Sequence, residues 1–135
     1  MKKVIFLFGL IVIMIIIAFG IKYSRYNKSD GWTYIKYNNA LYVLNMDSPE
    51  DNEEIIKNFE LVGTVNKKIP KYFEPIDNNT SNGIPEDVQI FKDNKIGDFS
   101  NIYILVDNKY YPLSNIETAE GWGNGIKANF NDLRG

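Results

Sequence analysis

Residues 34–44 are YIKYNNALYVL, two runs of aromatic and β-branched residues on either side of Asn38-Asn39. Asparagine tolerates the positive φ angles of a two-residue type I′ turn, so this stretch predicts a β-hairpin. Residues 102–113 repeat the pattern around Asp107-Asn108, and twelve residues from Tyr34 and from Tyr103 align without gaps at five identities. Two copies in an Ile-, Asn- and Tyr-rich chain indicate shared hairpin chemistry rather than a repeat protein.

One short helix and further strands are expected between the hairpins. Ser48-Pro49, followed by four carboxylates within residues 50–54, is typical of a helix start, because these groups complement unpaired N–H groups. We therefore expect a helix over residues 49–59 that packs on a sheet. Gly63 indicates a bulge or a close approach within a strand. The further strands are expected at residues 61–65 and 88–92, separated by a loop-rich segment.

The run Val4–Ile21 follows Met1-Lys2-Lys3 and contains eighteen residues without a charge. At about 1.5 Å per residue, a helix of this length reaches roughly 27 Å, close to the ~30 Å hydrocarbon layer of a bilayer. The run is apolar on every face, whereas a core helix of a globular protein normally keeps one polar face. A transmembrane helix over residues 1–21 is therefore expected.

This helix can be an uncleaved anchor or a cleavable signal peptide. Small residues that could mark a cleavage site occur at Ala18-Phe19-Gly20, inside the apolar run, which favours the anchor and leaves cleavage open. A lipid-modified cysteine is excluded because the chain has no cysteine. Basic residues flank both ends of the run, so charge leaves the orientation open. By analogy with export signals we favour an extracytoplasmic C-terminal domain.

The expected organisation is an α+β chain whose transmembrane helix precedes a small, mainly antiparallel β domain with two hairpins, extra strands and one short helix. Its parts are an anchor or signal peptide at residues 1–21, a juxtamembrane linker at 22–31, a β-rich extracytoplasmic domain at 32–114 and a polar, glycine-containing tail at 115–135. Residues 29–135 hold 10 basic and 17 acidic residues, a net charge of −7. This acidity argues against nucleic acid as a partner and favours a cationic one.

Catalytic and cofactor chemistry has few candidates. Without histidine or cysteine, an enzyme would depend on carboxylates, Lys, Ser, Thr or Tyr, and no specific motif marks any of these. The segment Asp77–Gly83 fails the EF-hand pattern, because its sixth and twelfth positions are Asn82 and Val88. The glycines at residues 121–125 lack the context of a phosphate loop. We expect no catalytic residue, no metal and no cofactor.

Aromatic side chains supply the candidate binding residues. Strand alternation sends Tyr110 and Tyr111 to opposite faces, so one core cannot bury both. Exposed tyrosines together with Trp32 would form a binding face. The alternative is that they are cross-strand pairs that stabilise a thin sheet. The candidate residues are Trp32, Tyr34, Tyr42, Tyr110 and Tyr111.

Four groups of residues occur in a suggestive order along the chain: Tyr37–Val43, Gly63–Val65, Ile84-Pro85 with Gln89–Phe91, and Ile104–Tyr111. In this order the chain resembles small uncharacterised exported or lipoprotein-like proteins of Gram-positive bacteria that carry a compact β-rich domain. It departs from them in having an apolar anchor in place of a lipid-modified cysteine, and Glu86-Asp87 where a Gly-Thr turn is more typical. The resemblance implies a location and a domain type, and no active site.

Three functions are compatible with these features. The favoured one is a non-catalytic, membrane-anchored binding or accessory domain outside the cell, with a protein or peptide partner at the cell envelope. The second is an immunity-type protein that captures a toxin or cationic peptide on its acidic surface. The third is a carboxylate-dependent cell-envelope hydrolase, whose paired acids would need a separation that sequence does not show.

Overall fold

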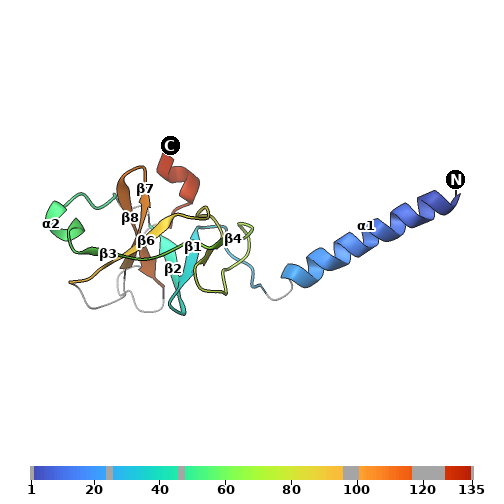
Figure 1. Cartoon of the computed structure of the whole chain (residues 1–135), viewed down its shortest axis with the longest axis horizontal. Coiled ribbons are helices and arrows are strands. Elements are labelled where there is room, and N and C mark those ends of the chain that lie inside the picture. The colour runs from blue at the N-terminus through green and yellow to red at the C-terminus, as the bar shows by residue number, and fades with distance from the viewer. Residues whose placement is uncertain (1, 24–25, 46–47, 96–100, 117–126, 135) are drawn as a thin grey trace.

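The computed structural model describes residues 2–23, 26–45, 48–95, 101–116 and 127–134. An N-terminal helix is followed by an eight-stranded, mostly antiparallel sheet curled into a half-barrel, so the fold is α+β (Figure 1). Its elements are α1 (Lys2–Tyr23), β1 (Tyr34–Tyr37), β2 (Ala40–Leu44), α2 (Glu53–Ile56), β3 (Phe59–Thr64), β4 (Lys67–Lys68), β5 (Thr80–Ser81), β6 (Gln89–Asp93), β7 (Asn101–Val106), β8 (Lys109–Asn115) and the C-terminal 3-10 helix η2 (Phe130–Arg134).

The sheet has the strand order β3-β6-β7-β8-β2-β1-β5-β4. All neighbouring strands pair antiparallel except β4 and β5, which pair parallel. The two hairpins are therefore joined through β2 and β8 at the centre of the sheet. The short strands β4 and β5 extend one edge, on the side of the domain that is nearest to α1 (Figure 1).

Both predicted hairpins are confirmed. Asn38 and Asn39 have φ angles of 49° and 63°, and Asp107 and Asn108 have φ angles of 50° and 63°. These are the left-handed conformations that a two-residue type I′ turn requires. The strands adjoining each turn pair in the expected register, with Tyr37 opposite Ala40 in one hairpin.

The predicted irregularity at Gly63 is also present. The register of β3 against β6 shifts between Leu61 and Gly63, as in a β-bulge. A Cβ atom on Gly63 would lie 2.8 Å from Nδ2 of Asn79, which donates a hydrogen bond to the carbonyl oxygen of Thr64. Gly63 therefore allows the Asn79 side chain to approach the strand.

The main core lies on one face of the curled sheet. Alternate residues of β7 contribute to it, with Ile102 and Ile104 fully buried and Tyr103 only half-buried on the other face. This is the period of two expected of a strand with one covered face. The buried core residues are Ile35, Tyr42, Leu44, Val65, Ile84, Ile90, Ile102, Ile104, Val106, Tyr111, Leu113, Ala128 and Phe130.

The short helix between the hairpins begins later than predicted. Asn52, not Ser48, is the N-cap of α2, and its side chain accepts a hydrogen bond from the backbone N–H of Glu54. The N–H of Glu50 is instead donated to the carbonyl oxygen of Tyr110 in β8 at 2.8 Å. The expected helix over residues 49–59 is therefore wrong in its bounds, because a bridge to a distant strand takes up its predicted first turn. No residue of α2 is buried.

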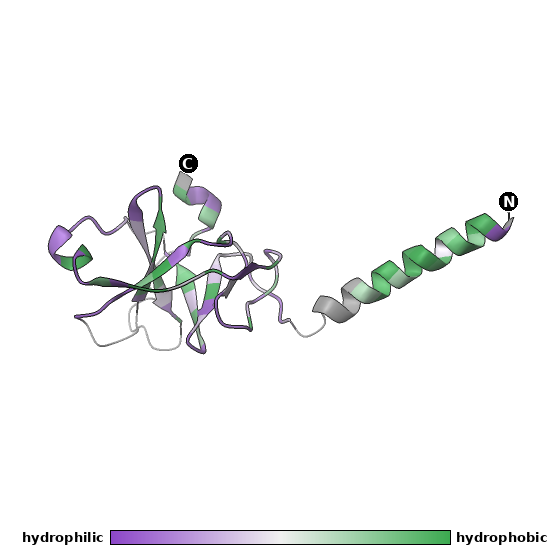
Figure 2. Ribbon diagram, viewed as in Figure 1, coloured by the Kyte–Doolittle hydropathy of each residue, from purple (hydrophilic) through white to green (hydrophobic). Residues whose placement is uncertain are grey.

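The N-terminal helix extends away from the β domain (Figure 1), and its residues 4–18 carry no charge and are mostly hydrophobic (Figure 2). Its bounds, Lys2–Tyr23, include nearly all of the predicted span, and its described side chains are those of residues 3–18, all exposed. Across the described residues, the structure contains no helix with both the length and the apolar character needed to span a bilayer. A membrane-spanning role for α1 therefore stays a prediction.

Two segments expected to lie outside the domain contact it in the structure. From the predicted linker, Tyr26 is buried, with its ring 5.9 Å from that of Phe73. From the predicted tail, Lys127 bridges to Asn45, while Ala128 and Phe130 join the core. The glycine-rich part of the tail, residues 121–125, lies outside the described residues.

Candidate functional site

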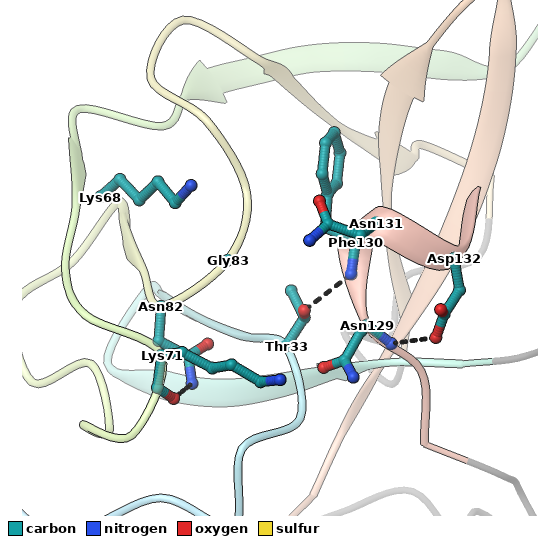
Figure 3. Close-up of a pocket in the computed structure, with 9 residues that line it drawn as sticks. All are labelled: Thr33, Lys68, Lys71, Asn82, Gly83, Asn129, Phe130, Asn131 and Asp132. Atoms are coloured by element: carbon teal, nitrogen blue, oxygen red, sulfur yellow. Dashed lines mark hydrogen bonds between the residues drawn. The ribbon is translucent and has the colours of Figure 1, made fainter. Parts of the chain in front are cut away.

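A cavity of about 440 Å³ lies between the β4–β5 edge of the sheet and the C-terminal segment (Figure 3). Its walls come from three stretches that are far apart in sequence, near residues 33, 68–83 and 129–132. Most of the lining groups are polar. The lining residues are Thr33, Lys68, Lys71, Asn82, Gly83, Asn129, Phe130, Asn131 and Asp132.

Asn82 holds two of these walls together. Its side chain is 2% exposed, and its Oδ1 accepts a hydrogen bond from the backbone N–H of Tyr34 at 2.7 Å. Its Nδ2 donates to the carbonyl oxygens of Trp32 and Lys71, both at 2.9 Å, and to Oγ of Ser29 at 3.3 Å. A buried amide with all its partners in place fixes the backbone that carries Lys71.

The C-terminal wall is attached through Thr33. Its Oγ1 accepts a hydrogen bond from the backbone N–H of Phe130 at 2.9 Å, and Phe130 is buried in the core. A Cβ atom on Gly83 would lie 2.6 Å from this same Oγ1. Gly83 is thus required for the close approach of its loop to Thr33, and the pocket has a fixed floor.

The ionisable groups at the pocket are two ammonium groups and one carboxylate. Lys68 and Lys71 both line the pocket, and Figure 3 shows the side chain of Lys71 extending toward Asn129. Within the described ranges, no carboxylate forms an ion pair with either lysine. Oδ2 of Asp132 accepts a hydrogen bond from the backbone N–H of Asn129 at 3.3 Å. The pocket therefore has an excess of positive charge in an acidic domain.

Asn129 has a side-chain oxygen to which no described residue donates a hydrogen bond. Its Oδ1 is buried, and among the described residues it has no hydrogen-bond partner. An orphaned buried oxygen is costly and uncommon in folded proteins. Because Asn129 lines the pocket, this oxygen would accept a hydrogen bond from a ligand hydroxyl group that reaches it.

A second polar cluster joins the segment after α1 to the C-terminal segment. Nζ of Lys127 donates to Oδ2 of Asp30 at 2.7 Å and to the hydroxyl oxygen of Tyr34 at 2.8 Å, while the Tyr34 hydroxyl donates to Asp30 at 2.9 Å. Burial alone would raise the pKa of Asp30, but the hydrogen bonds from Lys127, Tyr34 and the Trp32 backbone outweigh it and lower that pKa. Burial alone would lower the pKa of Lys127, but its hydrogen bonds to Asp30 and Tyr34 raise it. We interpret the cluster as a structural ion pair.

The five aromatic candidates do not form one exposed surface. Tyr34, Tyr42 and Tyr111 are 6%, 1% and 8% exposed, so they pack in the interior. This agrees with the alternative prediction, in which these tyrosines stabilise the sheet. Trp32 is 36% exposed, and Tyr110 is half-buried on the opposite face from Tyr111. Burial raises the pKa of both Tyr34 and Tyr42.

A different aromatic cluster lies on the outer face of the sheet. The ring of Phe59 stacks on Tyr103 at 4.3 Å and meets Tyr110 edge-on at 5.0 Å, and Phe91 meets Tyr110 at 5.1 Å. Leu61 beside them is 50% exposed. Burial, with smaller contributions from Glu50 and Asp93, raises the pKa of Tyr103. Cross-strand contacts of this kind stabilise a sheet face that lacks a covering layer.

The pocket residues were not identified from the sequence. The only available signal was the group of three lysines at positions 67, 68 and 71, which the net charge of −7 obscured. Asn82 lies in the segment expected to be loop-rich, and the structure shows it to be a buried hydrogen-bonding residue. Among the described residues, no group of three or more His, Cys, Asp or Glu is placed to hold a metal ion.

Comparison of the chain with protein-family models, with curated protein sequences and with solved structures finds no match. The resemblance to small exported proteins of Gram-positive bacteria therefore stays a prediction, and the chemistry of the pocket has to be argued from its own residues.

Proposed function

We propose that this chain is a membrane-anchored, extracytoplasmic, non-catalytic binding protein. In this proposal α1 is a retained anchor and the pocket of the β domain is the ligand site. The observation that carries the proposal is the exposure of the large apolar side chains of α1. From Val4 to Ile17 they are 40–72% exposed, and the helix extends away from the domain (Figure 1).

Exposed apolar side chains on all faces of a helix indicate an apolar surrounding. The apolar run of the sequence continues to Ile21, and fourteen of its eighteen residues are Val, Ile, Leu or Phe. On insertion scales these residues contribute on the order of −5 kcal/mol to transfer into a bilayer. The nearby basic residues at both ends would lie in the two interfacial regions.

The pocket supports a binding role for the domain. Its lysines, amides and hydroxyl can hold a polar ligand, and its floor is fixed by the buried hydrogen bonds of Asn82 and Thr33. A preformed polar site of this kind gives affinity without reorganisation of the domain. Its one carboxylate, Asp132, already accepts a backbone hydrogen bond, which suits ligand binding better than proton transfer.

Membrane association is tested by alkaline extraction of membranes from cells that express the full chain. We expect the wild-type chain to stay in the membrane pellet, and the double substitution Ile13→Asp and Ile16→Asp to release it. Each charge at a helix centre costs about 2.5–3.5 kcal/mol, so two of them exceed the favourable insertion energy. A matched double substitution to Leu at both positions should leave the chain in the pellet. Release of the wild-type chain would refute the anchor.

Orientation is tested with single introduced cysteines, because the native chain has none. Glu86 lies on an exposed turn of the domain, and Lys3 lies at the start of α1. We expect a membrane-impermeant maleimide to label Glu86→Cys in intact cells, and Lys3→Cys only after the cells are permeabilised. The reverse pattern would place the domain inside the cell.

A further inference from the structure

We propose that the pocket between β4 and η2 binds the phosphate group of a small phosphorylated polyol or sugar. In this assignment Lys68 and Lys71 hold the phosphate, and the amides of Asn129 and Asn131 bond to hydroxyl groups. The inference names the ligand class of the proposed binding site. It rests on the proposed function only in that a membrane-anchored domain would meet such a ligand at the membrane or outside it.

The charge of the site favours an anion. Two ammonium groups line the pocket without an ion-pair partner among the described residues, while the whole of residues 29–135 carries a net charge of −7. Two like charges that line the same pocket repel each other, so an anion bound there relieves an unfavourable arrangement. The acidity of the domain as a whole does not prevent this, because charges beyond a Debye length of about 8 Å are screened.

The number of cations favours phosphate over carboxylate. A phosphate monoester carries about −1.5 to −2 charges near pH 7 and a carboxylate carries one, so two lysines, which bind phosphate as point charges, match the phosphate better. The described cations at the pocket are Lys68 and Lys71. Asn82 fixes the backbone at Lys71, so the segment that carries this lysine is in place before the ligand arrives, while the side chains of both lysines are exposed.

The size and lining of the pocket favour a ligand larger than phosphate alone. Its volume of about 440 Å³ is within the usual range of small-molecule sites. Asn129 has a buried Oδ1 without a partner among the described residues, and Asn131 is exposed beside it. Amides donate and accept hydrogen bonds, as hydroxyl groups do, so a polyol or sugar attached to the phosphate fits this wall.

The pocket is also close to the point where the chain leaves α1. The backbone N–H of Ser29 donates to the carbonyl oxygen of Tyr72 at 2.8 Å, and Lys28 forms a β-bridge with Phe73. Tyr72 and Phe73 are the two residues that follow Lys71 in the sequence. Tyr72 is 66% exposed. A lipid headgroup and a free phosphate ester would therefore both reach the pocket, and they share the chemistry proposed for it.

The test is calorimetric titration of the full chain in a polyoxyethylene detergent, which carries neither phosphate nor sugar. The probes are glycerol 1-phosphate, inorganic phosphate and glycerol. We expect glycerol 1-phosphate to bind more tightly than inorganic phosphate, and glycerol to bind weakest. The double variant Lys68→Gln and Lys71→Gln should weaken binding of glycerol 1-phosphate by at least about tenfold. Equal binding of glycerol and glycerol 1-phosphate would overturn the phosphate assignment.

The matched control is the double variant Lys95→Gln and Lys109→Gln. It removes the same two charges from exposed lysines that do not line the pocket. We expect it to change affinity by less than about twofold, because exposed charges at a distance are screened. Equal weakening in both double variants would overturn the site, and so would the absence of binding to the wild-type chain at millimolar probe. Unfolding midpoints in urea confirm that each variant is folded.

The source of the phosphate is separated by repeating the titration in bilayer discs with and without phosphatidylglycerol. Competition by the lipid supports a headgroup as ligand, and unchanged affinity supports a free phosphate ester. Membrane extraction is measured on the same variants. A chain that binds glycerol 1-phosphate but is extracted from membranes would refute the anchor alone, whereas a retained chain that binds no probe would refute the pocket alone.

Discussion

Replacement of Asn82 by Ala should destabilise the β domain by about 3–5 kcal/mol. Asn82 is buried and makes four hydrogen bonds, three of them to backbone groups of Tyr34, Trp32 and Lys71. Loss of its side chain leaves the buried N–H of Tyr34 without a partner, at a cost of roughly 1–3 kcal/mol. The two part-buried carbonyls lose a bond worth about 1 kcal/mol each.

The magnitude is measured by urea unfolding of the full chain in non-ionic detergent, followed by tryptophan fluorescence. For a domain of about 100 residues, a loss of 3–5 kcal/mol lowers the thermal midpoint by roughly 12–25 °C. Asn78→Ala is the matched control. Asn78 also bridges two turns, to Asn39, but it is exposed, so its loss should cost less than about 1 kcal/mol.

Asn82→Asp separates hydrogen bonding from packing. The new carboxylate could still accept from the N–H of Tyr34, but it would face the carbonyl oxygens of Trp32 and Lys71. Its pKa should therefore be raised, and its destabilisation should grow as the pH rises from about 4 to 7. The reasoning is refuted if Asn82→Ala unfolds within about 1 kcal/mol of Asn78→Ala, or if the Asp variant shows no such pH dependence.

Three further substitutions test other parts of the structure. Asp30→Asn should cost about 0.5–1 kcal/mol at pH 7. The Asp30 pKa is lowered in the folded state, so the wild-type advantage should be lost as the pH falls below 3.8, the usual pKa of Asp. The Lys127 pKa is raised, so the advantage should also fall above pH 10.5, as Lys127 loses its proton. Equal urea midpoints of the two proteins at pH 7 would contradict the ion pair. Gly83→Ala would bring a Cβ within 2.6 Å of Thr33 Oγ1, so it should cost about 1–3 kcal/mol and weaken ligand binding, whereas unchanged stability would show that the loop can shift freely. Phe59→Ala should cost about 2 kcal/mol, because it removes the contacts of Phe59 with Tyr103 and Tyr110. Leu61→Ala, at a half-exposed neighbour, should cost less than about 0.5 kcal/mol. Equal unfolding midpoints of these two variants would argue against a stabilising aromatic cluster.

The hairpins could be predicted because their signals are local. Asn38-Asn39 and Asp107-Asn108 favour left-handed backbone angles whatever surrounds them, and the adjoining residues pair directly across the turn. The helix start at Ser48 could not be predicted reliably, since its signal competes with a distant partner. The bridge from Glu50 to Tyr110 joins residues sixty positions apart, and it moves the N-cap to Asn52.

The pocket could not be predicted, because each of its walls is unremarkable in sequence. Lys68 lies in a lysine-rich stretch that is also compatible with a solvated surface, and Asn129 lies in a segment expected to be a polar tail. The negative net charge of the domain favoured a cationic ligand. That charge is an average over the whole surface, and it hides the local positive charge of Lys68 and Lys71 at the pocket. Only the return of the C-terminal segment to Thr33 brings these groups together.

The sequence by itself determined the apolar N-terminal helix, the two hairpin turns and the absence of thiol and imidazole chemistry. These follow from residue types and from dihedral preferences that act over a few neighbouring residues. The tertiary structure decided which tyrosines are buried, where the short helix begins and that Lys68, Lys71 and Asn129 share a cavity. Those features depend on contacts between residues far apart in the chain, which form only when the curled sheet encloses its core.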